Sequence, residues 1–482
     1  MADRGAEHDH LNGTNGLDFE DIDYDDSPPP RPASIAEAVA QASEANLSLV
    51  RFLYCDNGGA VRGKMSNIRG LADRMTSGIA LTVAMQAMNM LDHLQSVDGL
   101  GPVGEVRLTP DPASFVRLPY ASGQGAMMCD LLTLDGSPWG ACPRSFLKRQ
   151  IARAAERGLH LQAAFECEFT LGSTDDEGNL VPIDQDLCFS SAAMNISAGY
   201  AYELLEALRF QGLELEQYYP ELGHGQQEFS IRHADALRAA DDAIVARETA
   251  RGLALSQGLV ATFAPKPLAD QAGNGAHIHF SVWDPAGSRN LFYDGGAPYK
   301  LSTLGRQFIA GVLAHLPGLL AITCPTVNSY RRLQPHSWAS AFTCWGLDNR
   351  EGALRLASPF RHSESATVNA ELKSSDGSNN PYLALGGLLA AGLDGIQQRL
   401  ELSEPVQVDP ANLSDAEREA RGIRRLPQSL GEALDALERD RVLSEALGPL
   451  LLASFVAVKR GEITDFIGEG MDYELRAHAR TF

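Results

Sequence analysis

The chain has 482 residues, with 40 basic and 62 acidic side chains and a formal net charge of −22. This acidic balance excludes a general nucleic-acid binder, because no excess of Lys and Arg exists to neutralise phosphates, and it disfavours docking on anionic membranes. No apolar run reaches the ~18 residues of a membrane span, no signal-peptide pattern is present, and the seven cysteines lack CxxC spacing, so we expect a cytoplasmic protein without membrane or nucleic-acid partners.

Residues 1–33 differ in composition from the rest of the chain. They hold nine acidic and two basic residues and close with a proline-rich run, Ser27 to Pro32. Low hydrophobicity, high charge and proline are typical of disordered segments, so we predict a disordered acidic tail. The simplest interpretation is a solvated extension without function, and the alternative is a docking tail for a partner.

The next segment predicts a small mixed domain, residues 34–140. A helix is expected over 35–45, where Ala and other apolar residues recur at helical spacing. The apolar run 47–54 reads as a strand, and Asn57-Gly58 is a hairpin signal that makes residues 60–64 the returning strand.

Residues 141–482 predict one large α+β domain. A helix is expected over 144–157, and strands and helices then alternate irregularly up to a helical C-terminal part. A GxGxxG pattern at Gly99–Gly104 contains a proline and leads into no helix, so it does not indicate a dinucleotide site.

The segment 161–169 alternates in character. Side chains two residues apart share a face of a strand, so Glu166 and Glu168 lie together, opposite Phe165 and Cys167. Adjacent carboxylates repel each other unless a cation lies between them. Taken alone, the pattern also fits a solvent-facing acidic edge.

Three later segments repeat this arrangement. Glu221 and Glu228 flank a glycine-rich turn, and residues 277–281 place His277, His279 and Ser281 on one strand face. The HxH pair taken alone fits either zinc or two exposed histidines. In the fourth segment, alternation puts three polar side chains on one face: Asn369, Glu371 and Lys373.

Together these segments supply five carboxylates and a histidine. Hard oxygen ligands suit Mg²⁺ or Mn²⁺ better than zinc, and two such ions on one sheet face normally hold phosphates. Arginines that can grip phosphoryl or carboxylate oxygens follow in the sequence, namely Arg331, Arg332, Arg350 and Arg355.

The chain resembles the glutamine synthetase family over most of residues 46–480. The order and spacing of several motifs carry the resemblance: FECEF, ELGHGQQEF, TFAPKP, GNGAHIHFS, NSYRRL, the Asn349-Arg350 pair and NNPYLALGGLLAAGLDGI. It implies an α+β fold with an N-terminal β-grasp domain and a catalytic domain built on a curved antiparallel sheet. It also implies a ring-shaped homo-oligomer, usually a double-ring dodecamer, and ATP-dependent ligation through γ-glutamyl phosphate.

The resemblance also assigns roles to single positions. One divalent ion would be held by Glu168, Glu221 and Glu228, and the other by Glu166, His277 and Glu371. The glutamate substrate would contact Gly273, Arg332 and Arg350, and the ATP phosphates would contact Arg350, Arg355, His279, Ser281 and Lys373.

Departures from the family pattern concern the ammonium site. Glutamine synthetases carry a glutamate in the flap that follows NSYKRL, and Trp338 stands at that place here. Their N-terminal Asp, contributed across the subunit interface, has no acidic counterpart in Gly78–Ala87. Losing both acids removes a cation site, and an aromatic lining suits an amine with a carbon substituent. Asn369 and Lys373 also replace family arginines.

Three hypotheses follow. The first is a glutamate–amine ligase that joins the γ-carboxylate of glutamate to a primary amine, with a small amine such as ethanolamine favoured over a polyamine. The second is a true glutamine synthetase with a rearranged ammonium site. The third is a non-catalytic structural or regulatory relative, which the six retained ligand positions argue against, because an acid cluster without metal is electrostatically costly.

Overall fold

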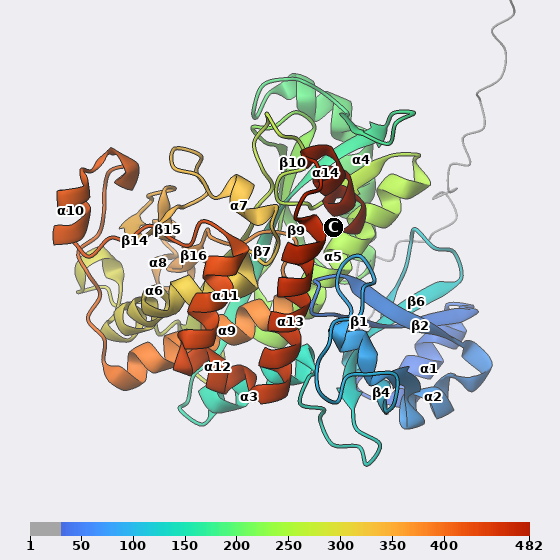
Figure 1. The fold of residues 1–482 in the computed structure, drawn as a ribbon. Helices are drawn as coiled ribbons and strands as arrows, with labels where there is room; N and C mark the ends of the chain where they lie inside the picture. The colour runs from blue at the N-terminus through green and yellow to red at the C-terminus, as the bar shows by residue number, and fades with distance from the viewer. Residues whose placement is uncertain (1–29) are drawn as a thin grey trace, which may run out of the picture.

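The computed structural model describes residues 30–482, and it divides into two regions that each surround a β-sheet (Figure 1). The predicted acidic tail, residues 1–33, lies outside the described residues except for its last four. Among those four, the Arg31 guanidinium lies 2.6 Å from Asp242 Oδ1, so the chain is held against the larger region from its first described residues.

The smaller, N-terminal region contains a six-stranded sheet in the order β2-β1-β6-β4-β3, with β5 paired to β6. The predicted hairpin is confirmed: β1 and β2 are antiparallel, with Cys55 opposite Val61, while β1 runs parallel to β6. The elements are α1 (Ile35–Glu44), β1 (Leu49–Cys55), β2 (Val61–Asn67), α2 (Leu71–Ser77), β3 (Ile79–Thr82), β4 (Glu105–Pro110), β5 (Val116–Arg117) and β6 (Gln124–Leu132).

The larger region is built on a ten-stranded sheet whose main path runs β14-β15-β16-β13-β7-β10-β9. All pairings along this path are antiparallel except β14 with β15, which agrees with the mostly antiparallel sheet that the resemblance implies. The strands are β7 (His160–Thr174), β8 (Leu180–Pro182), β9 (Leu215–Pro220), β10 (Gln226–Ile231), β11 (Ala234–Asp235), β12 (Val260–Thr262), β13 (Ala276–Trp283), β14 (Phe342–Leu347), β15 (Gly352–Leu356) and β16 (Ala370–Leu372).

Helices cover the apolar face of this sheet and leave the other face to polar groups. Phe165, Ile278 and Phe280 point into the core beneath the helices, as the alternation in sequence predicts. The helices are α3 (Pro143–Ala155), α4 (Ser191–Phe210), α5 (Ala236–Ser256), α6 (Thr303–Thr323), α7 (Ser329–Arg332), α8 (Glu364–Thr367), α9 (Pro381–Gln398), α10 (Asp415–Ala420), α11 (Leu430–Arg439), α12 (Arg441–Leu447), α13 (Pro449–Phe466) and α14 (Met471–Thr481).

The core helices α6 and α9 pack against each other at glycines. A Cβ on Gly311 would lie 2.3 Å from Ala391 O, and a Cβ on Gly395 would lie 2.2 Å from Gln307 O. The glycines that interrupt the apolar run of α9 therefore permit a close helix–helix approach. Of the described helices, α6 alone is long and apolar enough to cross a membrane by itself, and 67% of its apolar window is buried in the protein; the bent pair α12 and α13 meets the same test jointly.

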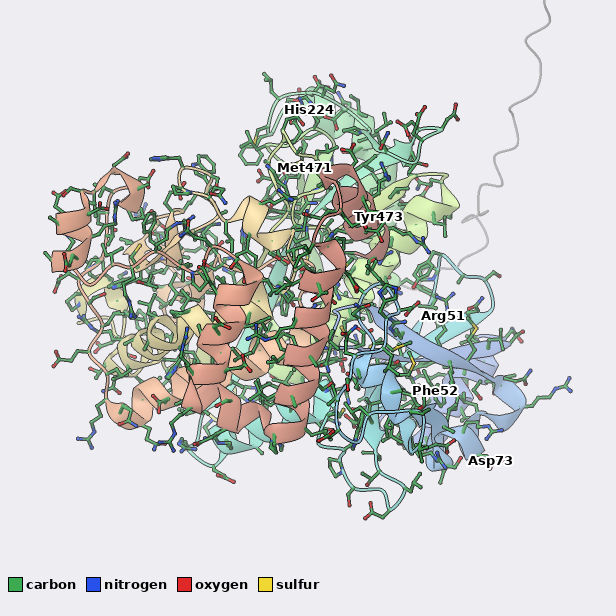
Figure 2. The ribbon with its side chains drawn as sticks, viewed as in Figure 1. Arg51, Phe52, Asp73, His224, Met471 and Tyr473 are labelled. Carbon is green, nitrogen blue, oxygen red and sulfur yellow. The ribbon has the colours of Figure 1, made fainter. Side chains whose placement is uncertain are left out.

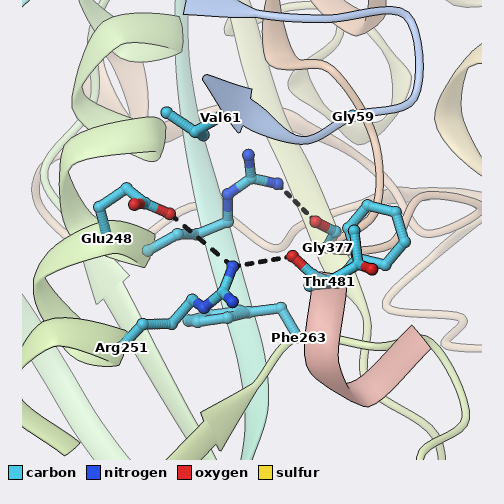
Figure 3. Close-up of a pocket in the computed structure, with 9 residues that line it drawn as sticks. Gly59, Val61, Glu248, Arg251, Phe263, Gly377 and Thr481 are labelled. Atoms are coloured by element: carbon cyan, nitrogen blue, oxygen red, sulfur yellow. Dashed lines mark hydrogen bonds and ion pairs between the residues drawn. The ribbon is translucent and has the colours of Figure 1, made fainter. Parts of the chain in front are cut away.

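The β1–β2 hairpin docks onto the larger region. Asn380 caps α9 and donates to the carbonyls of Cys55 and Asp56, so it links the hairpin to the start of α9. Close by, Figure 3 shows a pocket where the hairpin meets α5 and α14, with Arg251 donating to the carbonyl of Thr481. Its volume is about 10 Å³. A space of that size holds about one water molecule, so it is a small packing gap between the two regions rather than a ligand pocket.

Candidate active site

Strand register brings the predicted ligand positions onto one sheet face. Glu166 of β7 lies opposite His277 of β13, and Glu168 lies opposite Glu228 of β10. On the other side of β13, His279 lies opposite Glu371 of β16. Because the partners in each row face the same way, four strands that are distant in sequence concentrate their acids and histidines at one place.

His277 stands at the centre of this cluster. Its Nδ1 lies 3.4 Å from both Glu166 Oε2 and Glu371 Oε1, and its Nε2 lies 3.5 Å from Glu168 Oε1. Burial, followed by the charge of Lys373, lowers the pKa of His277. The ring is therefore neutral near pH 7, which is the form that ligates metals.

Cations surround one half of the cluster. Glu371 is fully buried, with Arg355 NH1 2.8 Å from Oε2 and Lys373 Nζ 3.1 Å from Oε1. Burial acts to raise the pKa of Glu371, but the charge of Lys373, the adjacent rings of His279 and His277 and the charge of Arg355 outweigh it and lower the pKa to about 2. This carboxylate is therefore ionised at any working pH.

The other half is acidic, and its carboxylates repel one another. Burial, followed by the charges of Glu166 and Glu168, raises the pKa of Glu228 to about 11. Burial and the charge of Glu168 raise the pKa of Glu221 to about 7. The hydroxyl of Tyr219 donates to Glu228. Among the described residues, no Lys, Arg or His side chain offsets the rise in the pKa of Glu221 or Glu228.

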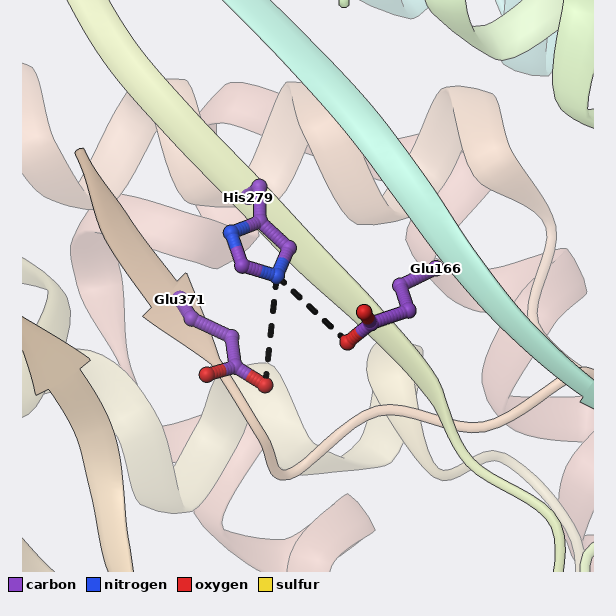
Figure 4. A group of neighbouring side chains, drawn as sticks. All are labelled: Glu166, His279 and Glu371. Carbon is purple, nitrogen blue, oxygen red and sulfur yellow. Dashed lines mark ion pairs between the residues drawn. The ribbon is translucent and has the colours of Figure 1, made fainter. Parts of the chain in front are cut away.

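Figure 4 shows the part of the cluster best arranged for a metal ion: one ligand atom from each of Glu166, His279 and Glu371 lies within 4.8 Å of the others. Burial acts to raise the pKa of Glu166, but hydrogen bonds with His277 and His279 hold it well below its usual range. The donor set, together with the mutual repulsion of the acidic half, fits divalent cations that prefer oxygen ligands.

The histidine of this group differs from the prediction. The resemblance assigns His277 to the metal and His279 to the nucleotide, whereas the compact group contains His279, with its Nε2 3.5 Å from Glu166 Oε2. His279 Nδ1 lies 2.9 Å from Asn369 Oδ1, so Asn369 orients the ring. Both histidines thus lie within reach of the same acids, and the division of roles between them stays a prediction.

The loop before β13 packs tightly against Arg332. The Gly273 carbonyl accepts a hydrogen bond from Gln226, and the Gly275 N–H donates to Glu168 Oε2 at 2.8 Å. A Cβ on Gly275 would lie 2.5 Å from Arg332 NH2. Arg332 itself is buried, donating to Ser375 O at 3.2 Å with its NH2 3.1 Å from His277 Nε2. A fixed guanidinium beside the cluster is suited to hold a carboxylate.

The remaining predicted residues lie at the margin. Ser281 is buried on β13, where its hydroxyl accepts the indole N–H of Trp283. Arg350 is exposed between β14 and β15 and forms no ion pair among the described residues. Trp338 lies in the flap with 62% of its surface exposed, and its backbone N–H donates to Glu351. The structure thus gathers the six ligand positions, Arg332, Arg355 and Lys373, but not Arg350.

Two neighbours of the cluster are absent from the predicted set. Gln226 donates to Glu168 Oε2 at 2.9 Å, and Tyr219 donates to Glu228. Both could have been found by strand alternation, because each lies two residues before a predicted ligand. The strand predicted over 367–373 is shorter than expected: β16 spans only Ala370–Leu372, and α8 occupies Glu364–Thr367.

Comparison with known proteins now decides the family. The model of the glutamine synthetase catalytic domain matches residues 140–478, and that of the glutamine synthetase N-terminal domain matches residues 34–139. The chain belongs to the glutamine synthetase family. It is therefore a relative of ligases that use ATP and a divalent metal and assemble as oligomers.

Individual relatives within the family carry different names. The chain is 37% identical over 454 residues to the gamma-glutamylpolyamine synthetase GlnA3 of Streptomyces coelicolor, covering 93% of this chain and 97% of the relative. It is 35% identical over 397 residues to a glutamine synthetase of Halobacterium salinarum, covering 80% and 86%. A solved structure titled "GmaS/ADP complex-Conformation 1" matches with a TM-score of 0.80 and 31% identity, covering 92% of this chain and 99% of that one.

Proposed function

We propose that this protein is a glutamate–amine ligase, which joins the γ-carboxylate of glutamate to a primary organic amine at the expense of ATP. The observation that carries the proposal is that one part of the site keeps the family residues while another part does not. The acid, histidine and cation cluster for phosphoryl transfer is complete, while the flap position of the ammonium-binding glutamate is Trp338. The similarity to a relative named for γ-glutamylpolyamine synthesis supports the same class of reaction.

The first half-reaction is the transfer of a phosphoryl group. The γ-carboxylate of glutamate attacks the γ-phosphorus of ATP, ADP leaves, and γ-glutamyl phosphate forms. Arg332 holds the α-carboxylate of glutamate, and Gly273 lies at its amino group. Arg355, Lys373 and Arg350 bind the transferring phosphoryl oxygens, with His279 and Ser281 toward the nucleotide. Positioning and neutralisation of charge supply most of the catalysis in such a transfer.

Two sets of residues would each hold one Mg²⁺ or Mn²⁺ ion, and the bound ions would supply positive charge that neutralises phosphate oxygens. One set is Glu168, Glu221 and Glu228, and the other is Glu166, His277 and Glu371. Within the second set, His279 is close enough to take the place of His277.

The second half-reaction is aminolysis. The amine nitrogen attacks the acyl carbon of γ-glutamyl phosphate, the C–O bond to phosphate breaks with its electron pair, and the nitrogen loses a proton. Trp338 lines the amine site in this proposal, giving a neutral wall for a carbon substituent. The N-terminal segment Gly78–Ala87, which forms β3 and a 3₁₀ turn, offers no carboxylate to hold ammonium.

The substrate class includes two kinds of amine. A single neutral wall suits a small amine such as ethanolamine, while the name of the Streptomyces relative supports a polyamine. The assembly is a double-ring dodecamer, which acts in the cytoplasm. Its chain is organised as the acidic tail 1–33, an N-terminal β-grasp domain 34–140 and a catalytic domain 141–482.

Phosphate release tests the proposal directly. The protein is incubated with ATP, Mg²⁺ and glutamate, in parallel with ammonium, methylamine, ethanolamine, putrescine or spermidine. Release with an organic amine but not with ammonium supports the ligase and identifies its substrate class. Release with ammonium alone overturns it in favour of a glutamine synthetase, and silence with every amine overturns it in favour of a non-catalytic relative.

A further inference from the structure

Glu351 lies in the turn that leads into β15, close enough to the catalytic cluster for the charge of Lys373 to act on its carboxylate. On β15, Arg355 lies opposite Glu371, and the backbone of Ala353 accepts the N–H of Lys373. The Glu351 backbone N–H donates to Asn349 Oδ1, and the residue is 8% exposed.

Its carboxylate lies where the flap carries Trp338. The Trp338 backbone N–H donates to Glu351 Oε1 at 2.8 Å. The flap is strained at this point, because His336, Trp338 and Ser340 have φ values of 59°, 54° and 66° in the left-handed region. Glu351 therefore anchors a strained backbone and places a negative charge next to the residue that replaces the family's flap glutamate.

Three other acidic side chains that could bind the amine already have partners within the chain. Asp409 lies 2.7 Å from His336 Nδ1 and caps a 3₁₀ turn, and Asp348 accepts two hydrogen bonds from Ser358. Asp56 is paired with Arg62 in the N-terminal region. Burial raises the pKa of Glu351, and the charges of His336 and Lys373 act in the opposite direction; the ion pair of Lys373 itself is with Glu371. No ion pair among residues 30–482 involves Glu351.

We propose that the Glu351 carboxylate binds the positively charged amino group of the amine substrate, supplying from the turn before β15 the negative charge that the flap lacks because Trp338 stands in place of its glutamate. This inference rests on the proposed function and adds a specificity determinant to it. The carboxylate contacts the backbone N–H of Trp338, so an amine held by Glu351 is bound next to the residue that carries the indole, whose ring can then contact the carbon substituent. Free ammonium would use only the first of these contacts.

The decisive variant is Glu351→Gln, because glutamine keeps an acceptor for the Trp338 N–H while losing the charge. With the preferred organic amine, we expect KM for the amine to rise about 10- to 100-fold, with KM for glutamate and ATP changed less than about twofold. Glu351→Asp, which keeps the charge on a shorter side chain, should recover part of the loss. Glu364→Gln removes a partly exposed acid paired with Lys300 and controls for the loss of one charge.

Hydroxylamine separates failure of this inference from failure of the proposed function. It is an uncharged nucleophile at neutral pH, so γ-glutamyl hydroxamate formation in Glu351→Gln should fall far less than turnover with the charged amine. Equal losses with both nucleophiles, or an unchanged KM for the amine, would overturn the role of Glu351 while leaving the ligase intact. A wild-type protein that uses no organic amine would overturn both.

Discussion

The two halves of the carboxylate cluster differ in what neutralises them. Around Glu371, the chain supplies its own cations, Lys373 and Arg355, and the carboxylate has a depressed pKa. Around Glu221 and Glu228, the nearest charges are other acids, and the pKa values rise to about 7 and about 11. One half is electrostatically complete in the chain alone, whereas the other needs a cation from solution.

This difference explains why the same sheet face tolerates five buried or half-buried acids. An ionised carboxylate in a low-dielectric setting is stable only when paired. The Glu371 half is held rigid by its own ion pairs and can position a phosphoryl group before the metal arrives. In the Glu228 half, the carboxylates repel one another until a metal ion binds between them. Metal binding should therefore increase the stability of the fold.

The largest effect should come from breaking the self-neutralised half. Glu371→Gln leaves Lys373 and Arg355 without their carboxylate, and removing one partner of a buried pair costs about 3–5 kcal/mol. We expect a loss of about that size in the free energy of unfolding, measured by denaturant titration in EDTA, together with loss of ligase activity. Glu364→Gln breaks the more exposed pair with Lys300 and should cost less than about 1 kcal/mol. Equal stability of these two variants would contradict the picture.

Metal should act mainly on the acidic half. At a concentration of about 100 times Kd, a ligand that binds only the folded state stabilises it by about 2.7 kcal/mol. We therefore expect Mg²⁺ to raise the denaturation midpoint of the wild type and to do so less in Glu228→Gln. An identical Mg²⁺ response in the two proteins would show that Glu228 does not ligate the ion.

Local sequence rules were sufficient for the strands that carry this site. Alternation in 161–169 and 277–281 predicted the faces of β7 and β13, and strict period 2 fixes which side chains share a face. Alternation cannot supply register, however. That Glu166 lies opposite His277 and Glu168 opposite Glu228 depends on pairing between distant strands. The family resemblance grouped these residues as shared metal ligands but gave no register.

The flap shows where prediction from sequence stopped. Trp338 was identified by its position in a motif, but the contact between its N–H and Glu351 depends on three left-handed residues within the five positions 336–340. Non-glycine residues rarely adopt that conformation, so no local propensity indicates it. The group of Glu166, His279 and Glu371 could not be predicted from local sequence either. His277 and His279 share a strand face, so side-chain rotamers decide which histidine lies nearer the acids.

Removing an acid from the metal-dependent half should have the opposite sign to Glu371→Gln. In the absence of metal, Glu228 must be protonated in the folded state near pH 7, which costs free energy because the unfolded chain ionises it. Glu228→Gln removes that cost and keeps an acceptor for Tyr219. We expect a gain of about 2 kcal/mol in EDTA, seen as a higher denaturation midpoint, while activity falls. A destabilised variant in EDTA would show that the acids do not repel one another.

The smallest effect concerns pH and Glu221. Its pKa is about 7 in the fold against 4.5 in the unfolded chain, so the folded state binds the proton more tightly. The contribution of Glu221 to stability is therefore full below pH 4.5 and is lost as pH rises through 7. Glu221 is partly open to solvent, so the difference between Glu221→Gln and wild type in EDTA should grow only from near zero at about pH 4 to about 1 kcal/mol at about pH 8. Saturating Mg²⁺ should abolish or reverse this difference, because the ion then needs the ionised carboxylate; a pH-independent difference in EDTA would place Glu221 outside the repelling set.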